Sequence, residues 1–504
     1  MSRPRRLSWS KLPDEFLWSS YDPDNNASLI ETGVFSFLGE TRMLGRPLNW
    51  NPDAPVLWKF NLHYFNYLHL LDPNGRDRIR KEWMSANPAS VRSVAWHPYP
   101  TSLRIVNWCR SGSSDADINA SLARQADYLY RNCETHLLGN HLLENARALL
   151  VAGAYFKGTP SANKWTNRGL LILLKQIDEQ VLADGAHFER SPMYHAIVLV
   201  GLLDAVATHR EDLARYPVLS DTIRKMLQFL AGVTRPDGTL AQFNDCSNSV
   251  ALPTRRITEY AQSMGFTTNE VRSEFPEGGY YRTGSGDGFQ VIVDAGDIGP
   301  DYLPAHAHAD IFSYECYLRE TPLVVDTGVY EYAEGNARRF DRSTRAHSTV
   351  TVDGIDQAEM WSSFRVGRRF RPKNVRVSRS GKGWSFHGVF DGYGRLVGDD
   401  IRHVREIMNT GREVSVSDVV SGFGSHLVSS RITLHPDVQV VAHETRAELT
   451  ACGESIRFEV QEGVLRLENG MYSSRFGERR NRTVLVVEHD GPLPCALRYT
   501  LSVK

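Results

Sequence analysis

The chain has 504 residues, of which 41% are hydrophobic and 23% charged, a composition typical of a soluble globular protein with two or three domains. Its formal net charge of −1 excludes a global basic field for nucleic acid or a membrane surface, so any polyanion must meet a local arginine cluster. Six scattered cysteines without a CxxC pair exclude a disulfide framework and a zinc ribbon.

The N-terminal segment predicts neither export nor a membrane anchor. Its first twenty residues are basic but lack an apolar run of signal-peptide length, so we expect a cytoplasmic protein. No stretch reaches the roughly 18 apolar residues that a membrane-spanning helix needs. We therefore expect no membrane span and no nucleic-acid partner, while the sequence leaves the oligomeric state open.

Up to about residue 275, apolar residues recur at helical spacing in long segments joined by short polar links. Successive helices with short links favour antiparallel hairpins wound into a solenoid or a toroid. We predict a helical domain over residues 1–275. Its helical segments are 60–71, 141–156, 167–183, 195–209 and 220–234.

From residue 276 to residue 504 the pattern changes to short β-rich runs that alternate with Gly, Asp and Asn turns. This order indicates stacked antiparallel sheets rather than βαβ units. We predict an antiparallel β domain over residues 276–504. Its runs include "GFQVIVDAG", "STVTVDGI", "REVSVSDVVSG", "LVSSRITLH", "VQVVAH", "SIRFEV", "RTVLVVEH" and "ALRYTLSV".

The segment "GNHLLENARALL" places polar side chains where a helix begins. His141 and Glu144 are three residues apart and so share one face of that helix, next to Asn140. These three residues are candidates for a site. Capping is the alternative, with Asn140 as the N-cap and Glu144 as a favourable charge in the first turn.

The segment "DGAHFERSPMYHAIVL" contains a tight turn followed by an apolar helix. Ser191 can cap this helix, and Pro192 suits its first position. Tyr194 then falls in the first turn, where the positive end of the helix dipole favours a phenolate. The alternative is a buried tyrosine with a satisfied hydroxyl.

The segment "HAHAD" places His306 and His308 two residues apart, on one side of an expected strand. Two histidines and a carboxylate can bind zinc, and Asp326 and His347 would complete a tetrahedral set. The alternative is one histidine in a core hydrogen bond and one exposed to solvent. The spacing alone leaves open whether the two histidines bind metal, transfer protons or divide these roles.

Two runs of arginines follow the histidine segment along the chain. A charge run is usually a solvated face, but this position favours the binding of an anion. Our candidates for substrate binding are Arg190, next to the tyrosine segment, and Arg338, Arg342 and Arg345 from the first run. The runs also contain Arg339, Arg365, Arg368, Arg369 and Arg371.

Taken together, segments between about residue 58 and residue 370 resemble the heparinase II/III family of polysaccharide lyases, and they occur in the family's order. The resemblance implies an N-terminal (α/α) toroid followed by a C-terminal antiparallel β-sandwich. It also implies eliminative cleavage of an acidic, uronic-acid-containing polysaccharide, either glycosaminoglycan-like or bacterial and capsular. By the same resemblance, a periplasmic or secreted protein is the alternative to the expected cytoplasmic one. The matching segments are "WKFNLHYFNYL", "WHPYPTSLRIVNW", "GNHLLENARAL", "DGAHFERSPMYH", "AHAHADIFSYE", "VDTGVYEY" and "RSTRAHSTV".

The resemblance also implies catalytic roles. An enzyme that eliminates across a uronate must neutralise its carboxylate, remove the C5 proton and protonate the leaving oxygen. Asn140 or His141 resembles the group that meets the carboxylate, and Glu144 matches an acidic residue found in part of the family. Tyr194 resembles the group that serves the glycosidic oxygen. His306 resembles the general base, with Tyr194 able to take that role for the opposite C5 epimer.

A zinc ion is implied as well. His308, Asp326 and His347 resemble the ligands of a zinc that some family members bind. Such a zinc would be structural, because it would hold the segments that present His306. One departure is Ser348, since the family often has Asn after the last histidine.

Two other classes of function stay open. The histidines with aspartate also suit a metal-dependent glycan hydrolase, although such enzymes usually have a βα barrel and their zinc needs an open coordination position. The other class is a glycan-binding protein without catalysis. An unsaturated product would mark elimination, chain cleavage without it would mark hydrolysis, and binding without any product would mark a binding protein.

Overall fold

The computed structural model describes residues 8–19, 21–268, 271–283, 286–381 and 383–504. The chain forms two compact units. The first holds the described residues up to 181 together with 196–225 and 255–268, and the second holds 182–195, 226–254 and the rest of the described chain from 271. Two segments of the helix-rich half therefore belong to the second unit. The division at residue 275 stays a prediction about domain organisation.

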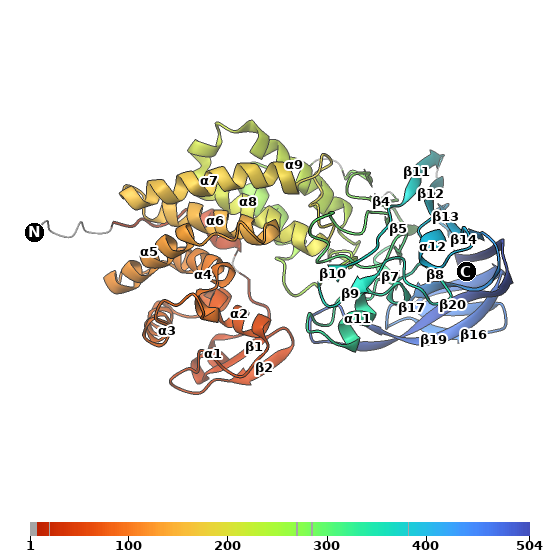
Figure 1. Ribbon diagram of the computed structural model, residues 1–504, viewed down its shortest axis with the longest axis horizontal. Helices are drawn as coiled ribbons and strands as arrows, with labels where there is room; N and C mark the ends of the chain where they lie inside the picture. Colours follow the sequence, from red (N-terminus) through yellow and green to blue (C-terminus); the bar gives the residue numbers. More distant parts are fainter. Residues whose placement is uncertain (1–7, 20, 269–270, 284–285, 382) are drawn as a thin grey trace, which may run out of the picture. The chain divides into compact units, whose positions relative to one another are not determined.

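Helices make up most of the first unit (Figure 1). Several of them begin at side chains that favour helix starts. Asp72 accepts a hydrogen bond from Gly75 N at 2.6 Å, and Pro73 takes the first helical position. Asp115 and Thr159 cap two further helices in the same way. The helices of this part of the chain are α1 (Ala27–Thr32), α2 (Val56–Tyr64), α3 (Pro73–Ala86), α4 (Pro98–Ser111), α5 (Ala116–Arg131), α6 (Gly139–Tyr155), α7 (Pro160–Gln180), α8 (Pro192–Leu213), α9 (Pro217–Gly232) and α10 (Thr254–Ser263), with a small hairpin of β1 (Val34–Phe37) and β2 (Glu40–Met43).

Helices α6 and α7 pack closely because glycines stand at their contact. A Cβ atom at Gly169 would lie 2.9 Å from the carbonyl oxygen of Ala146. A Cβ atom at Gly153 would lie 2.1 Å from Oγ1 of Thr166. Any larger residue at either position would push the helices apart.

The predicted helix over residues 60–71 is interrupted, so that prediction is only partly right. Helix α2 ends at Tyr64, Phe65 has a φ of +62°, and a 3-10 helix follows over Asn66–Leu70. Phe65 is fully buried, stacked on Trp50 and edge-on to Trp108. Burial of this ring between tryptophans outweighs the cost of a left-handed backbone.

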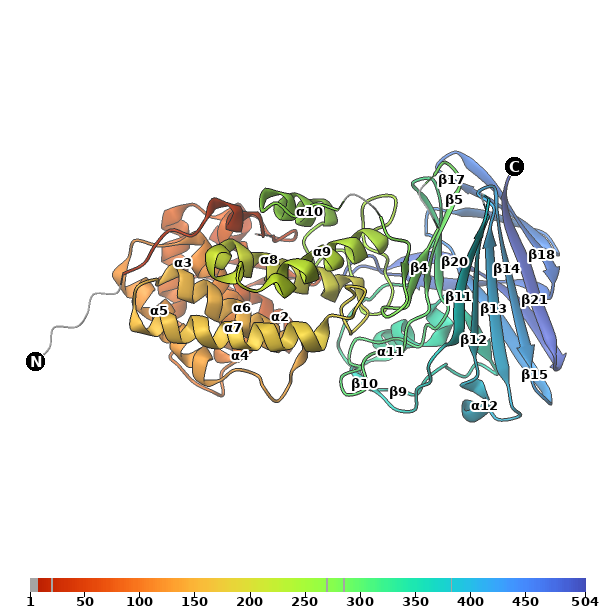
Figure 2. The same ribbon diagram turned by 90° about the horizontal axis from the view of Figure 1, so that it is seen from above.

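Most of the second unit is made of antiparallel sheets (Figure 2). Strands from these sheets share one apolar core. The sheets and the helices of the N-terminal half confirm the predicted fold class, an (α/α) toroid followed by an antiparallel β-sandwich. One sheet has five strands in the order β3 (Glu274–Phe275), β4 (Tyr280–Arg282), β5 (Phe289–Asp294), β6 (Tyr314–Leu318) and β7 (Thr321–Val324). Another has eight, in the order β11 (Lys373–Ser380), β12 (Gly383–Phe390), β13 (Arg402–Asn409), β14 (Glu413–Ser421), β21 (Cys495–Val503), β18 (Glu454–Glu462), β17 (Arg446–Ala451) and β16 (Gln439–Ala442). A third has four, in the order β19 (Val464–Tyr472), β20 (Arg480–Pro492), β15 (Ser425–Thr433) and β8 (Val350–Val352).

Strand β14 shows why its sequence forms a sandwich strand. Every second residue is buried, which is the alternation that a sheet with one covered face requires. The buried residues of this strand are valines, except for Asp418. Arg405 donates to both of its oxygens, at 2.7 and 2.8 Å, and His403 donates to it at 2.8 Å, so the buried charge is paired.

Between the strands run the loops that carry the candidate site. One loop joins β5 to β6, and another joins β7 to β8 and contains α11 (Asn336–Arg342). A short hairpin follows, with β9 (Met360–Trp361) and β10 (Arg365–Val366), and α12 (Tyr393–Leu396) lies further along.

Among the described residues, one helix has the length and hydropathy that would suffice to cross a bilayer. It is α8, over Pro192–Glu211, and 83% of that stretch is buried inside the protein. Such burial is what a helix of a protein core shows.

Candidate active site

Tyr194 and His306 lie against each other in the second unit. Helix α8 begins at Pro192 as predicted, and Ser191 Oγ accepts a hydrogen bond from Tyr194 N at 3.3 Å, so the helix start fixes the tyrosine. The phenol ring stacks on the imidazole with centroids 3.8 Å apart. Tyr194 is 8% exposed, and the side chain of His306 is 12% exposed. Both groups are therefore largely enclosed without being sealed.

The segment with His306 and His308 is a loop, so the predicted strand is wrong. Its backbone donors do not pair with a neighbouring strand. The N–H of His308 donates to Oδ1 of Asn244 at 3.0 Å, and the N–H of Ala309 donates to the carbonyl of Arg342 at 3.0 Å. These two partners take the place of the hydrogen bonds that a neighbouring strand would supply, and they fix the loop beside Asn244.

Asp245 joins the two histidines. His306 Nδ1 donates to its Oδ2 at 2.9 Å, and His308 Nε2 donates to its Oδ1 at 2.8 Å. Arg338 donates to both oxygens, to Oδ2 at 2.8 Å. Burial alone would raise the pKa of Asp245, but Arg338 and the two histidines hold it well below its ordinary value. The carboxylate is thus ionised and fixes the orientation of both imidazoles.

Five side chains form a closed ring of contacts, which we call the contact ring: Tyr194, His306, Asp245, Arg338 and Tyr332. The guanidinium of Arg338 lies 4.9 Å from the centre of the Tyr332 ring, and the hydroxyls of Tyr332 and Tyr194 are 3.2 Å apart. Desolvation raises the pKa of Tyr332 well above its ordinary value. Tyr332 therefore keeps its proton and can donate it in a hydrogen bond to the oxygen of Tyr194.

Glu189 adds a second carboxylate near the imidazole. Its Oε2 lies 3.5 Å from His306 Nε2, on the nitrogen that Asp245 does not hold. Glu189 is buried. The imidazole of His306 therefore lies between two carboxylates, Asp245 on the Nδ1 side and Glu189 on the Nε2 side.

A candidate metal group lies behind His306. One ligand atom each from His308, Asp310 and His347 lies within 4.8 Å of the other two, and all three residues are buried. His308 Nδ1, Asp310 Oδ2 and His347 Nε2 have no hydrogen-bond partner within the described chain, although they are buried. Two imidazole nitrogens and one carboxylate oxygen left unpaired in this way fit a divalent transition metal.

The carboxylate of this group differs from the predicted one. Asp326 was predicted as the ligand, and the structure places Asp310 there instead. Oδ2 of Asp326 accepts from His347 Nδ1 at 2.8 Å. Burial lowers the pKa of His347, but Asp326 outweighs it and raises that pKa to about 9, while burial lowers the pKa of His308 to about 4. Asp245 and Asp326 each hold the outer nitrogen of one histidine, the arrangement usual behind metal-bound imidazoles.

The predicted substrate arginines mostly contact the protein itself. Arg338 is buried in the contact ring, and buried Arg342 donates to the carbonyl of Ser362 at 2.8 Å. Arg190 donates to the carbonyl of Glu277 at 3.2 Å. Arg345 is exposed and pairs with Glu468 at 3.0 Å. Arg190, Arg338 and Arg342 therefore bind groups of the protein itself.

Asn140, His141 and Glu144 belong to the first unit. Leu138 precedes α6 as the N-cap residue, so Asn140 does not cap the helix and the capping alternative is wrong for it. His141 Nδ1 lies 3.0 Å from Glu134 Oε1, and its ring stacks on Tyr99 at 4.2 Å.

The third residue of this group, Glu144, is buried and accepts two hydrogen bonds from Arg147, at 3.0 and 3.2 Å. Burial raises its pKa. Among the described residues, no side-chain hydrogen bond is recorded for the carboxamide of Asn140.

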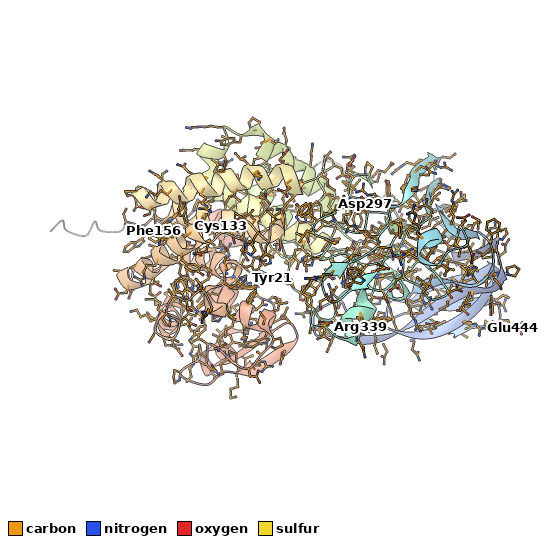
Figure 3. All side chains as sticks on the ribbon, viewed as in Figure 1. Tyr21, Cys133, Phe156, Asp297, Arg339 and Glu444 are labelled. Carbon is orange, nitrogen blue, oxygen red and sulfur yellow. The ribbon has the colours of Figure 1, made fainter. Side chains whose placement is uncertain are left out.

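The second unit also has a polar pocket of about 380 Å³. Its lining contains neither Tyr194 nor His306, so it is separate from the contact ring. The lining residues are Asp297 (labelled in Figure 3), Ile298, Gly299, Asp301, Gly367, Arg368, Arg369, Phe370 and Arg371.

The sequence-based predictions gave no role to several members of the site: Asp245, Glu189, Tyr332 and Asp310. Asp245 lies in "QFNDCSNS", a polar stretch that interrupts the helical pattern, and this interruption was the available signal. Glu189 and Asp310 stand inside the segments already singled out. Tyr332 ends the segment "VDTGVYEY", which resembles the family, but the sequence analysis assigned it no role.

Two family models match the chain. One is described as Heparinase II/III N-terminus and matches residues 113–271. The other is described as Heparinase II/III-like, C-terminal, and matches residues 267–499. Together they cover the part of the chain that holds the contact ring and the candidate metal group.

Curated and solved proteins agree with these models. A heparin-sulfate lyase of Pedobacter heparinus is 25% identical over 365 residues, which are 61% of this chain and 54% of that protein. A heparin-sulfate lyase of Bacteroides stercoris is 29% identical over 254 residues, 44% of this chain and 37% of that protein. The chain thus spans about half or less of these relatives. A solved heparinase III structure has a TM-score of 0.75 at 15% identity, covering 99% of this chain and 85% of that one, which shows the same fold.

Proposed function

We propose that this chain, which belongs to the heparinase II/III-like family, is a polysaccharide lyase that cleaves a uronic-acid-containing polysaccharide by β-elimination. Two similar curated proteins are named heparin-sulfate lyases. The stacked pair of Tyr194 and His306 is the observation that carries the proposal.

The pair can supply both proton transfers. Asp245 holds His306 Nδ1, so Nε2 is the nitrogen that can take the C5 proton of a uronate. The electron pair of the broken C5–H bond forms the C4–C5 double bond, and the C4–O bond to the leaving sugar breaks. The Tyr194 hydroxyl donates its proton to the leaving oxygen. For the opposite C5 epimer, Tyr194 acts as a phenolate, which Tyr332 stabilises by a hydrogen bond. It takes the C5 proton and passes the same proton to the leaving oxygen, so the phenolate is restored.

The uronate carboxylate must be neutralised before C5 becomes acidic enough to lose its proton. The proposal gives this task to Asn140 or His141 of the first unit. Glu144 is bound to Arg147 and supports this region from inside the helix bundle.

A divalent ion, zinc in our proposal, would be held by His308, His347 and Asp310. When bound, such an ion supplies structural cross-linking between the loop after β5 and the loop after β7. With His308 fixed by the ion, the orientation of His306 would be restrained as well, because both imidazoles donate to the carboxylate of Asp245.

A screen of uronate polysaccharides tests the proposal. The chain is incubated separately with heparan sulfate, chondroitin, hyaluronan and alginate, and the unsaturated product is followed by its ultraviolet absorbance. We expect at least one polymer to give this product. Chain cleavage without unsaturation would identify a hydrolase, and polymer binding without cleavage would identify a binding protein.

A further inference from the structure

The β9–β10 hairpin beside the contact ring exposes two large aromatic side chains. Trp361 is 57% exposed and Phe364 is 41% exposed. We propose that this hairpin is a sugar-binding subsite in which Trp361 stacks on a pyranose ring and Arg365 pairs with the acidic group of that sugar. The proposal rests on the proposed function and specifies where its substrate chain binds.

The hairpin borders the reacting pair. The ring centroid of Phe364 lies 6.1 Å from that of His306 and 5.4 Å from that of Tyr332. A sugar bound on the hairpin would therefore be within about one residue of the sugar that meets His306.

Two buried arginines fix the hairpin tip. Arg338 donates through Nε and Nη2 to the carbonyl of Ser363, at 3.0 and 2.8 Å. Arg342 donates to the carbonyl of Ser362 at 2.8 Å. Both arginines thus fix the backbone of the hairpin tip from its buried side. The hairpin is therefore ordered before a ligand binds, which reduces the conformational entropy lost on binding.

Trp361 and Arg365 share one face of the hairpin. They are directly opposite partners in the β9–β10 register, and opposite residues of an antiparallel pair point to the same side. The indole lies against Gly367, where a Cβ atom would come within 2.7 Å of the ring. Because Gly367 has no side chain, one edge of the indole packs on the backbone at this position, while the rest of the ring stays exposed. An aromatic face beside a cation suits an acidic pyranose, which has an apolar ring face and a charged substituent.

Arg365 differs from its neighbours in charge pairing. Arg368 pairs with Glu359 at 2.7 Å, and Arg369 pairs with Asp301 at 2.9 Å. Arg371 pairs with the same Asp301 at 3.2 Å. Within the described chain, no carboxylate is recorded within ion-pair distance of the exposed Arg365 guanidinium. Its charge is therefore available for a ligand.

The test compares Trp361→Ala and Arg365→Ala with two matched controls in the same unit, Phe423→Ala and Arg402→Ala. Phe423 is 69% exposed, and Arg402 is exposed on β13. KM and kcat are measured on the polymer that the wild type cleaves. Affinity electrophoresis through gels containing that polymer gives the dissociation constant for each chain. Melting temperatures establish that all variants are folded.

We expect each hairpin variant to raise KM and the dissociation constant by about tenfold or more, the size of one ordinary contact, with kcat near wild type and both controls unchanged. Trp361→Phe should restore most of the affinity because it keeps a ring. The Arg365→Ala variant should also bind with a weaker dependence on salt.

Unchanged affinity in both hairpin variants would overturn the proposal. A fall in kcat without a change in KM would also overturn it, because the hairpin would then act on His306 rather than on the sugar. If the wild type forms no unsaturated product from any polymer, the proposed function fails. The electrophoresis with heparan sulfate, chondroitin, hyaluronan and alginate still decides the subsite, since it needs no turnover.

Discussion

The phenol of Tyr194 and the imidazole of His306 are stacked with their planes 22° apart. An acid and a base that act in one elimination must reach neighbouring atoms of the same sugar. Stacking brings both groups to one place, with the Tyr194 hydroxyl 3.2 Å from that of Tyr332 and His306 Nε2 3.5 Å from Glu189 Oε2, which meets this requirement for orientation.

Tyr194→Phe keeps the ring and the stack but removes the hydroxyl. We expect turnover to fall by roughly 10²–10⁴-fold, the range typical of a lost proton-transfer group. Melting temperature and polymer affinity should stay near those of the wild type. A variant with nearly normal turnover would remove Tyr194 from the mechanism.

Asp245→Asn should lower kcat strongly and change KM little, because the amide cannot hold His306 Nδ1 and Arg338 as the carboxylate does. Leaving Arg338 buried without its counter-ion should also cost on the order of 3–5 kcal/mol in stability. Asp418→Asn is the matched control, since Asp418 likewise holds one arginine and one histidine inside the sandwich. Equal losses of kcat in the two folded variants would show that Asp245 acts through stability alone.

Metal content should separate the two histidines of "HAHAD". After reconstitution with zinc and removal of excess metal, elemental analysis should find no metal in His308→Ala and normal metal in His306→Ala. His308→Ala should also have the lower melting temperature, because a structural metal contributes folding free energy. The reverse pattern, or a wild type that retains no metal, would contradict the division of roles.

Asp310→Asn and Asp326→Asn form a second pair for the same assay. The geometry predicts that Asp310→Asn loses metal and that Asp326→Asn weakens its binding by about 10–100-fold, the usual effect of losing the carboxylate behind a ligand. Complete loss only in Asp326→Asn would restore the ligand set that the sequence predicted.

Asn140→Ala should lower kcat by roughly 10²–10³-fold, the effect of removing one donor from a developing anion. His141→Ala should have the smaller effect, because Glu134 and Tyr99 engage its ring. Stopped-assay kinetics on the same polymer compare the two. A larger loss of kcat in His141→Ala would show that His141, not Asn140, neutralises the uronate carboxylate.

Acid should destabilise the fold through buried histidines. Burial lowers the pKa of His195 to about 4, so between pH 6.5 and 4 the unfolded chain binds more protons than the folded one. The contribution of neutral His195 to the free energy of unfolding is complete above about pH 6.5 and is lost as the pH falls. At pH 5 the loss is about 2 kcal/mol. Melting temperature against pH should be flatter for His195→Gln than for the wild type, and an equal slope in the two proteins would contradict this prediction.

The fold could largely be predicted because hydrophobic period is a local property. The helical segment 141–156 and the alternation of β14 both follow from neighbours a few residues away. The break at Phe65 could not be predicted, since it depends on Trp50 and Trp108 as packing partners.

The site divides in the same way. Ser191 and Pro192 mark the helix start and so place Tyr194 in the first turn, while its catalytic role was predicted from the resemblance to the lyase family. The pairing of Asp245 with His306 spans 61 positions, and no local pattern encodes it. The contacts of the arginines could not be predicted for a related reason, because a charge run has the same composition whether it faces solvent, as at Arg345, or a buried carboxylate, as at Arg338. Their role in substrate binding stays a prediction.

The interleaving of the two units has a practical consequence for expression. A truncated protein that starts near residue 276 would keep His306, His308 and every strand of the three large sheets except β3. It would lose Tyr194 and Asp245, which come from the earlier segments 182–195 and 226–254. Arg338 would then be left with a buried charge and no carboxylate. A soluble fragment of the β-rich half is therefore best designed by grafting those two segments back, not by cutting where the secondary structure changes.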